Sequence, residues 1–383
     1  MIPAAAYLVW RYYAALQQFY PASRWKRLIL PFLFCSFFTF PISALVYSFF
    51  SGGIDLLEFP KALNYWFWFG LIFVYALATW VILADVIKLV SHHFSRRIRL
   101  IDSIYIQVLL LLFVATFCFT GWKTYTDTSK IHIQRTRLQI DDLPANLDGF
   151  RIVHISDIHG DEYTGRKKIG RYIQKVNQLK PDLIVFTGDL ISYGTDYIRM
   201  SAQQLGEAKA TYGVTAVVGD HDYWAGVENV KQALNQQGIP LIQDSNYSLK
   251  IDSTNEVLIT GVTEVYSKKA APGIVDSLTQ QTGNSAFKIF ASHQISDRLI
   301  EDAQKHNYDV MLAGHTHGGQ IRIPFLGMTF SASDLETKYI SGIYREGNII
   351  INVNNGLGFT LAPIRYNAPP NISLIRLVAK GDS

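Results

Sequence analysis

Charged side chains are scarce in this chain. Only 17% of its 383 residues are Asp, Glu, Lys or Arg, and 49% are hydrophobic. Soluble globular domains carry roughly 25% charged residues. The deficit indicates that part of the chain lies outside water, and the length allows about two or three structural units.

Cysteine is almost absent as well. Cys35 and Cys118 both lie inside apolar runs, and no cysteine follows Cys118. This excludes a disulfide framework and a thiolate metal site. The positive charge is also small, with a formal net charge of +4 and a pI of about 8.8. So weak an excess does not favour nucleic acid as a partner. Much of it flanks apolar segments, which favours a lipid bilayer instead.

Three long runs carry no charge: residues 28–50, 63–83 and 104–122. Each approaches the roughly 20 residues that cross a hydrocarbon core about 30 Å thick. Pro31 and Pro41 interrupt the first run, but membrane helices tolerate proline. Buried helices of a soluble core are the alternative. Three such runs joined by short charged links favour a transmembrane region of about three helices over residues 28–122.

Residues 1–27 are a poor signal peptide, because they have no basic start and Arg11 interrupts the apolar stretch. We expect an amphipathic or partly inserted segment there. Near the end of the second run, Asp85 and Lys88 are expected to pair locally, three residues apart. Residues 123–148 are predicted to form a connector and a first strand, and residues 149–383 a catalytic domain.

The basic links predict an orientation. Basic side chains stand before the first run and between the second and third: Arg24, Lys26, Arg27, His92, His93, Arg96, Arg97 and Arg99. The remaining link carries Asp55, Glu58 and Lys61. The positive-inside rule places the basic links in the cytoplasm. We therefore expect a multi-pass protein of a bacterial inner or plasma membrane whose catalytic domain is extracytoplasmic. Four basic residues after the third run favour the opposite orientation: Lys123, Lys130, Arg135 and Arg137.

After residue 149, apolar strands alternate with helices such as residues 166–179 and 227–237, a pattern typical of an α/β fold. Five strand-like runs each end in Asp or His. The runs are FRIVHIS before Asp157 and His159, DLIVFT before Asp189, VTAVV before Asp220, His221 and Asp222, KIFAS before His293, and DVMLA before His315 and His317. A single sheet would gather these side chains at its carboxyl edge, where α/β proteins bind ligands. Gly188, Gly219 and Gly314 would allow sharp turns there.

Carboxylate and imidazole ligands without thiolate suit Mn, Fe, Zn or Co better than Ca or Mg. Even seven ligands from among these nine side chains are more than one ion needs. Two ions that share a bridging carboxylate, about 3.5–4 Å apart, fit the number and can clamp a phosphoryl group.

The motifs SDIHGD, TGDLIS, VVGDHDYW, ASHQ and LAGHTHGGQ stand in the order seen in calcineurin-like metallophosphoesterases. The chain resembles that family from about Ile131 to Val378. It is most similar to the membrane-anchored branch, in which a Pro follows GHTHGGQ and the later half carries SGIY and NNGLG. The resemblance implies an α/β fold with two sheets sandwiched between helical layers, placed here after an N-terminal multi-span helical membrane region.

The resemblance also assigns roles. It implies that a first metal is held by Asp157, His159 and His317, that Asp189 bridges, and that a second metal is held by Asp220, His293 and His315. It implies hydrolysis by a metal-bridging hydroxide, with Mn²⁺ the first choice among Mn, Zn, Fe and Co. His221 would protonate the leaving group, and Asp222 would hold His221 in place.

The third motif departs from the family, because Asp220 stands where Asn is usual. The added carboxylate makes the formal charge of the site less positive by one unit. Diesters and pyrophosphates are then favoured over phosphate dianions. Tyr223 and Trp224 follow this motif. We expect core packing for both, the alternative being a surface that stacks on a base, a sugar or an acyl chain.

These patterns predict a membrane-tethered phosphoesterase that acts on a phosphodiester or pyrophosphate of a small-molecule, lipid-linked or envelope substrate. A UDP-2,3-diacylglucosamine pyrophosphate hydrolase of lipid A synthesis is an alternative, but it would need a cytoplasmic site. A non-catalytic metal-binding receptor or scaffold is an alternative of another class. The complete ligand set, together with His221, favours the enzyme.

Overall fold

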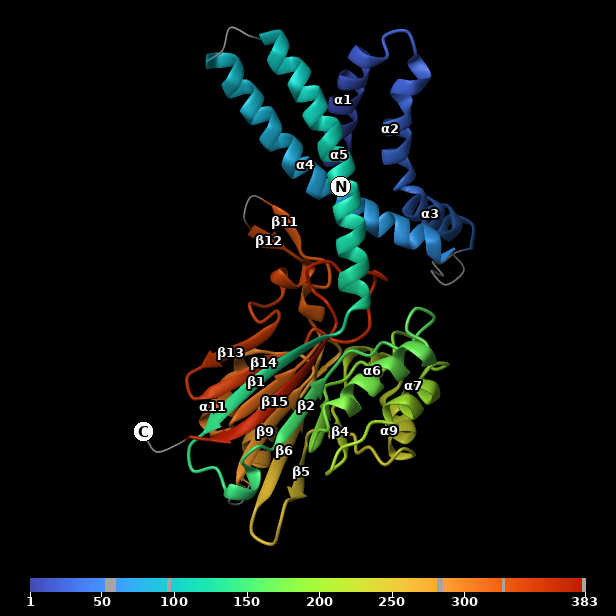
Figure 1. Ribbon diagram of the computed structural model, residues 1–383. Coiled ribbons are helices and arrows are strands. Elements are labelled where there is room, and N and C mark those ends of the chain that lie inside the picture. The colour runs from blue at the N-terminus through green and yellow to red at the C-terminus, as the bar shows by residue number, and fades with distance from the viewer. Residues whose placement is uncertain (52–59, 95–97, 281–284, 326–327, 381–383) are drawn as a thin grey trace. The chain divides into compact units, whose positions relative to one another are not determined.

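The computed structural model describes residues 1–51, 60–94, 98–280, 285–325 and 328–380 (Figure 1). Asp55, Glu58, Arg96 and Arg97 lie outside these ranges. The chain falls into two compact units. The helical unit comprises Met1–Thr128, Ile321–Ser331 and Ala362–Asn367, and the sheet unit comprises Ser129–Gln320, Ala332–Leu361 and Ala368–Ser383.

Five helices build most of the helical unit: α1 (Ile2–Phe19), α2 (Arg24–Ser36), α3 (Thr39–Ser51), α4 (Lys61–Phe94) and α5 (Ile98–Ser129). In the part of the chain that the structure describes, α4 and most of α5 are each long and apolar enough to span a membrane. The α2–α3 pair is bent by 55°, so it is either one broken span or a re-entrant loop.

The first apolar run, residues 28–50, is therefore divided between two helices, and its role as one of about three spans stays a prediction. The chain bends at Phe37, where α2 ends. Pro41 lies in the first turn of α3. It has no N–H to donate to the carbonyl of Phe37, and its ring crowds that carbonyl, so a continuous helix is broken here.

Aromatic side chains fill the core of the helical unit. The Phe34 ring stacks on that of Phe73, and the Phe37 ring lies 4.8 Å from that of Trp66. A Cβ added at Gly70 would lie 2.3 Å from the Phe37 ring, so only glycine leaves room for this ring at that position. The later residue of the first helix thus contacts the earlier residue of the second, so α2 is antiparallel to α4.

Two ion pairs in this unit join charged residues of different helices. Asp85 on α4 binds Arg11 of α1 at 2.5 Å and accepts hydrogen bonds from the hydroxyls of Tyr7 and Tyr105. Lys88 binds Asp102 of α5 at 2.8 Å. The expected local pair of Asp85 and Lys88 is therefore wrong, because each finds a partner on another helix. Pairing of this kind lowers the cost of burying charge among apolar helices.

The same contacts fix the direction of α1. The Met1 amine donates to the Tyr75 hydroxyl at 2.6 Å, whereas Arg11 reaches Asp85, further along α4. Helix α1 thus runs parallel to α4. The link between α1 and α2 lies at the end of the unit where α4 finishes in His92 and His93.

Two segments distant in sequence complete the helical unit. A hairpin of β11 (Ile323–Phe325) and β12 (Met328–Phe330) lies beside α4. Ile321, Ile364 and Tyr366 pack with Leu71 and Ile72 of α4.

The sheet unit contains two large sheets. The first has the order β1-β15-β2-β3-β4 and the second β13-β14-β10-β9-β6-β5. The first is built from β1 (His132–Ile140), β15 (Asn371–Ala379), β2 (Arg151–Ile155), β3 (Leu183–Phe186) and β4 (Val214–Ala216). The second is built from β13 (Gly342–Glu346), β14 (Ile349–Val353), β10 (Val310–Ala313), β9 (Phe287–Ser292), β6 (Glu256–Val262) and β5 (Ser245–Lys250).

The expectation that one sheet gathers all five motif strands is wrong, because β2, β3 and β4 lie in the first sheet and β9 and β10 in the second. The two sheets bury apolar faces against each other. Ile152 and Val185 of the first share a core with Ile259, Ile289 and Leu312 of the second. Strands that are apolar on both faces must be shielded from water on both sides of the sheet. The facing sheet shields one side.

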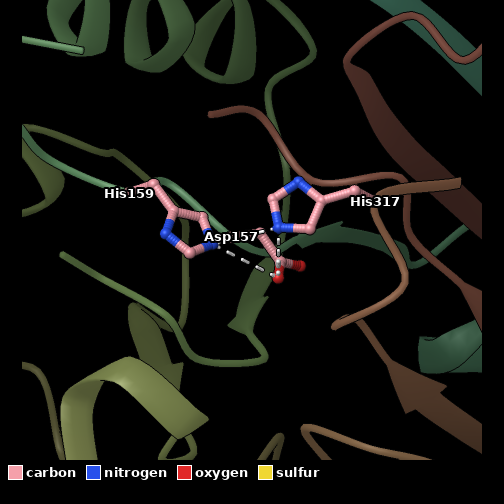
Figure 2. A group of neighbouring side chains, drawn as sticks. All are labelled: Asp157, His159 and His317. Atoms are coloured by element: carbon pink, nitrogen blue, oxygen red, sulfur yellow. Dashed lines mark hydrogen bonds and ion pairs between the residues drawn. The ribbon is translucent and has the colours of Figure 1, made fainter. Parts of the chain in front are cut away.

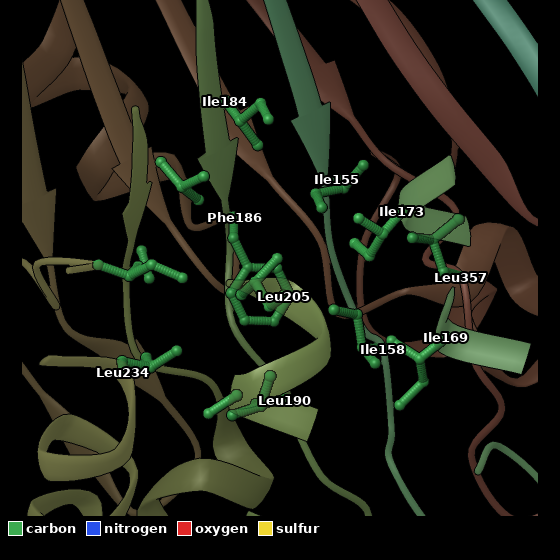
Figure 3. Close-up of a cluster of buried hydrophobic side chains, with 14 of the residues drawn as sticks. Ile155, Ile158, Ile169, Ile173, Ile184, Phe186, Leu190, Leu205, Leu234 and Leu357 are labelled. Carbon is green, nitrogen blue, oxygen red and sulfur yellow. The ribbon is translucent and has the colours of Figure 1, made fainter. Parts of the chain in front are cut away.

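Helices cover the outer faces. Helices α6 (Arg166–Gln178), α7 (Ile198–Leu205) and α9 (Val227–Asn235) pack on the first sheet, as Figures 1 and 3 show. Ile169 and Ile173 of α6 contact the cluster that contains Ile155 and Phe186. Helices α10 (Ile274–Gln280) and α11 (Asp297–Lys305) cover the second sheet. The predicted two-sheet sandwich between helical layers is confirmed.

His154 predicts how this fold responds to acid. Its ring is fully buried, with Nδ1 2.6 Å from Oδ1 of Asn352 and Nε2 2.9 Å from Oγ1 of Thr187. Burial lowers the pKa of His154 from 6.5 to about 4. The unfolded chain therefore takes up a proton at a pH where the folded chain does not. The resulting stability is present above pH 6.5 and is lost as the pH falls towards 4.

We expect acidification from pH 7 to pH 4.5 to lower the free energy of unfolding through His154 by up to about 3 kcal/mol. His154→Gln, which keeps hydrogen-bonding groups but does not titrate, should show a shallower fall. Thermal unfolding of both proteins in detergent across this range measures the difference. Equal slopes would show that His154 does not contribute.

Candidate metal centre

All seven predicted ligands meet where strands end. Asp157 and His159 follow β2, Asp189 follows β3, and Asp220 opens α8 (Asp220–Trp224). His293 follows β9, and His315 and His317 follow β10. Six of the seven residues are buried, and His315 is partly exposed. The sequence prediction that these side chains lie close together is therefore confirmed.

One cluster contains Asp157, His159 and His317, whose ligand atoms all lie within 4.8 Å of one another. Figure 2 shows the Asp157 carboxylate facing the rings of both histidines. Nε2 of His317 lies 3.4 Å from Oδ1 of Asp157 and 3.0 Å from Nε2 of His159. Two imidazole nitrogens at this separation, beside a carboxylate, are arranged as ligands of one ion.

A second cluster contains Asp220, His293 and His315. Nδ1 of His293 donates to the carbonyl of Thr187 at 2.7 Å, so Nε2 points inward. That nitrogen lies 3.3 Å from both Asp189 Oδ2 and Asp220 Oδ2. It is buried and makes no hydrogen bond within the described residues. A cation would satisfy it, because buried polar atoms are rarely left without a partner.

Asp189 stands between the clusters. Its Oδ2 is 3.4 Å from Nε2 of His159 in one cluster and 3.3 Å from Nε2 of His293 in the other. Burial opposes ionisation of Asp189, but the neighbouring imidazoles of His293 and His159 outweigh it and hold its pKa well below the usual range. A carboxylate shared in this way suits a binuclear site.

Buried carboxylates this close together need positive charge. Burial raises the pKa of Asp157 to about 6. At His293, burial favours the neutral ring, yet Asp189 and Asp220 raise its pKa well above 6.5. The buried carboxylates of the site would thus be stabilised by a bound cation. The donor set, oxygen and imidazole nitrogen without thiolate, fits two divalent metal ions.

The backbone is strained at the ligands. Five of the seven have positive φ: Asp157 at 50°, His159 at 47°, Asp189 at 57°, His315 at 70° and His317 at 52°. Such left-handed conformations cost an L-residue on the order of 1 kcal/mol each and concentrate at functional sites. The surrounding fold therefore holds these side chains in directions that relaxed strands would not give them.

The three glycines named from the sequence, Gly188, Gly219 and Gly314, fill two different roles. Only Gly188 turns with a positive φ, of 92°. A Cβ on Gly219 would lie 2.2 Å from the backbone nitrogen of Asp189, and a Cβ on Gly314 would lie 1.9 Å from Oγ of Ser156. Gly219 and Gly314 are thus required because neighbouring segments approach closely.

The role expected of Asp222 is corrected by the structure. Its carboxylate accepts hydrogen bonds from the backbone N–H groups of Asp189 and Leu190, both at 2.8 Å, and of Gly219 at 3.1 Å. It does not hold His221, whose Nδ1 instead faces the carbonyl of Ser192. Asp222 lies in the first turn of α8, from which its side chain turns back towards unpaired N–H groups. It therefore fixes the loop that carries Asp189.

Residues that sequence reasoning missed explain why Asp220 replaces Asn. Gln294 donates to Oδ2 of Asp220 at 2.8 Å, and the Tyr266 N–H donates to Oδ1 at 2.6 Å. Both oxygens therefore accept, which an amide could not do. Glu336 lies 3.1 Å from Nε2 of His315 and leaves Nδ1 facing Asp220. Gln294 adjoins a motif, but nothing in the sequence marks Tyr266 or Glu336.

The NNGLG segment supports the first motif. The N–H groups of Leu357 and Gly358 donate to the carbonyl of Asp157, at 3.1 and 2.7 Å. Gly356 has φ 71°, and a Cβ there would lie 2.6 Å from Cβ of Asp157. The segment thus stabilises the strained backbone of Asp157 through these two hydrogen bonds.

Core packing was expected for Trp224, and the structure corrects this too. Its side chain is 57% exposed, and its ring lies 4.9 Å from that of His221. Tyr223 is partly buried. Helix α8 is a single short turn at the edge of the site, so its last residue faces the opening.

Comparison with known proteins places this site in a family. Residues 150–319 match the model of the calcineurin-like phosphoesterases. The Bacillus subtilis metallophosphoesterase YkuE is 28% identical over 260 residues, which are 67% of this chain and 89% of that protein. A Danio rerio transmembrane protein with metallophosphoesterase domain is 28% identical over 279 residues, covering 70% and 62% of the two chains. The Escherichia coli phosphodiesterase YaeI is 26% identical over 274 residues, covering 69% and 95%.

The matched region contains every ligand described above, from Asp157 to His317. The buried Asp and His clusters are intact, and they occupy the ends of the strands of a two-sheet sandwich. Residues 150–319 therefore form a calcineurin-like metallophosphoesterase domain with intact metal ligands, and the protein is a metal-dependent phosphoester hydrolase.

Proposed function

We propose that this protein is a membrane-tethered phosphoesterase that cleaves a phosphodiester or pyrophosphate of a lipid-linked or envelope substrate. The observation that carries the proposal is the pair of adjacent Asp and His clusters sharing Asp189. The same chain has two or three candidate membrane spans. A relative is described as a phosphodiesterase, which supports a diester substrate.

The charge of the site supports the same substrate class. Asp220 is a carboxylate whose two oxygens are both hydrogen-bonded. Asp157, Asp189 and Asp220 together offset most of the charge of two divalent ions. The advantage that a phosphate dianion has over the single negative charge of a diester is then smaller than it would be with Asn at position 220.

Asp157, His159 and His317 would hold one ion and Asp220, His293 and His315 the other, with Asp189 between them. Such ions, with Mn²⁺ the first choice among Mn, Zn, Fe and Co, would supply an activated water and neutralise phosphoryl oxygens. His221 belongs to a cluster with His159 and Asp189, so it lies at the edge of this centre. Its Nδ1–H donates to the Ser192 carbonyl, and its Nε2 would give a proton to the leaving oxygen.

Purified protein in detergent should cleave an aryl phosphodiester when loaded with Mn²⁺, lose this activity to a chelator and regain it when metal is restored. Turnover and bound metal are measured on the same sample. Protein that holds two equivalents of Mn, Zn, Fe or Co in turn, yet turns over no phosphodiester or pyrophosphate, would contradict the proposal.

Substitution of His221 should lower the rate alone, whereas substitution of Asp222 should lower both the rate and the metal content. His221→Ala should lower the rate by about 10²–10⁴ while both metals stay bound, since His221 donates a proton. The loss should be larger for an alkoxide leaving group than for nitrophenolate, which needs no proton. Asp222→Ala should lower metal content as well, because the loop of Asp189 loses two hydrogen bonds and Gly219 loses a third. His306→Ala is the matched control, because that ring binds Asp276 on the surface instead. Full metal content in Asp222→Ala would contradict its supporting role.

We propose further that the sheet unit is extracytoplasmic. Arg24, Lys26 and Arg27 begin α2, and this helix starts at the end of the helical unit that carries His92 and His93. Basic residues therefore gather at one end, which the positive-inside rule assigns to the cytoplasm. Helix α5 leads away from that end into β1.

Protease added to intact spheroplasts should therefore cleave the sheet unit. An epitope at the C-terminus, followed by immunoblotting before and after lysis, gives the readout, and a cytoplasmic enzyme serves as the control for integrity. Protection before lysis with cleavage after it would reverse the orientation and favour a cytoplasmic, nucleotide-linked substrate.

A further inference from the structure

Two large aromatic side chains stand exposed beside the metal centre. Trp224 is 57% exposed and Tyr266 is 55% exposed. The Trp224 ring lies 4.9 Å from that of His221, and the Tyr266 ring lies 5.1 Å from that of His315. Rings of this size gain much from burial, so leaving both in water next to the reacting groups favours a ligand that covers them.

Both rings are held in place without a ligand. They are parallel within 6°, with centroids 6.4 Å apart. The indole N–H of Trp224 donates to Oγ of Ser267 at 2.8 Å. The Tyr266 hydroxyl donates to Glu336 at 2.7 Å, and its backbone N–H donates to Asp220. Because the rings are already ordered, little conformational entropy is lost when a ligand stacks on them.

The position of the rings identifies the part of the substrate that they meet. His221 would protonate the leaving oxygen, so the leaving group lies on the side of the centre where Trp224 contacts His221. This step rests on the function proposed above. Trp224 and Tyr266 then face the leaving group, and the attacking water lies on the other side of the phosphorus.

The surroundings favour a ring over an acyl chain. Tyr266 and His315 also line a cleft of about 430 Å³. Polar side chains supply much of its lining: Lys269, Gln294, Ser296, Thr337 and Lys338. An acyl chain would leave these groups without partners, which is unfavourable. A ring with a flat apolar face and a polar edge can stack on the aromatics and still bond to the cleft.

We propose that Trp224 and Tyr266 form a stacking platform for the leaving group, and that this group carries a planar or flat-faced polar ring, either a heteroaromatic base or a pyranose sugar. Stacking on an aromatic side chain tolerates either ring, because both present an apolar face. The platform would select the substrate, whereas the metal ligands and His221 act on the phosphorus and its oxygens.

Binding of three phosphate monoesters to the metal-loaded full-length protein tests this. Uridine 5′-monophosphate carries a base, glucose 6-phosphate a pyranose, and glycerol 3-phosphate no ring. Calorimetry should show about tenfold tighter binding of at least one ring-bearing ester than of glycerol 3-phosphate. Which of the two binds more tightly identifies the ring.

Trp224→Ala should lower this preference about tenfold, Trp224→Phe should retain part of it, and Tyr266→Leu should lower it independently. Tyr223→Ala is the matched control on the same turn and should keep the preference. Equal affinity for all three esters, or a preference unchanged in both Trp224→Ala and Tyr266→Leu, would overturn the platform. Binding is measured without turnover, so inactivity towards every phosphoester would count against the proposed function alone.

Discussion

The accumulation of negative charge around Asp189 is the constraint on which the catalytic half of this molecule depends. Asp157, Asp189, Asp220 and Asp222 are all buried within one small volume. Burial, and after it the negative charge of Asp189, raises the pKa of Asp222 to about 7. Three buried N–H groups, the inward-facing imidazoles and the strained backbone are all arranged around this charge. Two bound cations would complete the arrangement.

The ligand set could be predicted from sequence because each ligand directly follows a short apolar strand. Strand ends are positions that pattern alone locates, and parallel strands bring their carboxyl ends together. The partition of those strands into two sheets could not be predicted in this way. Strands buried on both faces have the same sequence pattern in either arrangement, so only the facing residues, such as Ile152 and Ile289, decide it.

The side-chain contacts around the metal ligands could not be predicted from the sequence, for a different reason. Asp222 was expected to hold its neighbour His221, yet it caps three backbone N–H groups, because its direction depends on one short helical turn. Tyr266 lies in the turn between two short strands, Glu264–Val265 and Lys268–Lys269, and Glu336 follows a short 3-10 helix. Such short elements have no periodic pattern, so the sequence does not mark either residue. In the helical unit, Pro41 was expected to be tolerated, so the bend at Phe37 was not predicted. The partners of Asp85 and Lys88 lie on other helices, and only packing reveals them.

The chain path between His317 and Glu336 has a consequence for separating the two units by proteolysis. Ile321–Ser331 clusters with helices α1 to α5, although it lies between a metal ligand and the residue that orients His315. Cleavage after α5 would strip Leu71 and Ile72 from Ile321, Ile364 and Tyr366 and expose this apolar surface to water. Shedding by proteolysis would thus yield an aggregation-prone fragment with a disturbed metal loop. The helical unit therefore includes two segments, Ile321–Ser331 and Ala362–Asn367, that a cut after α5 would leave attached to the sheet unit.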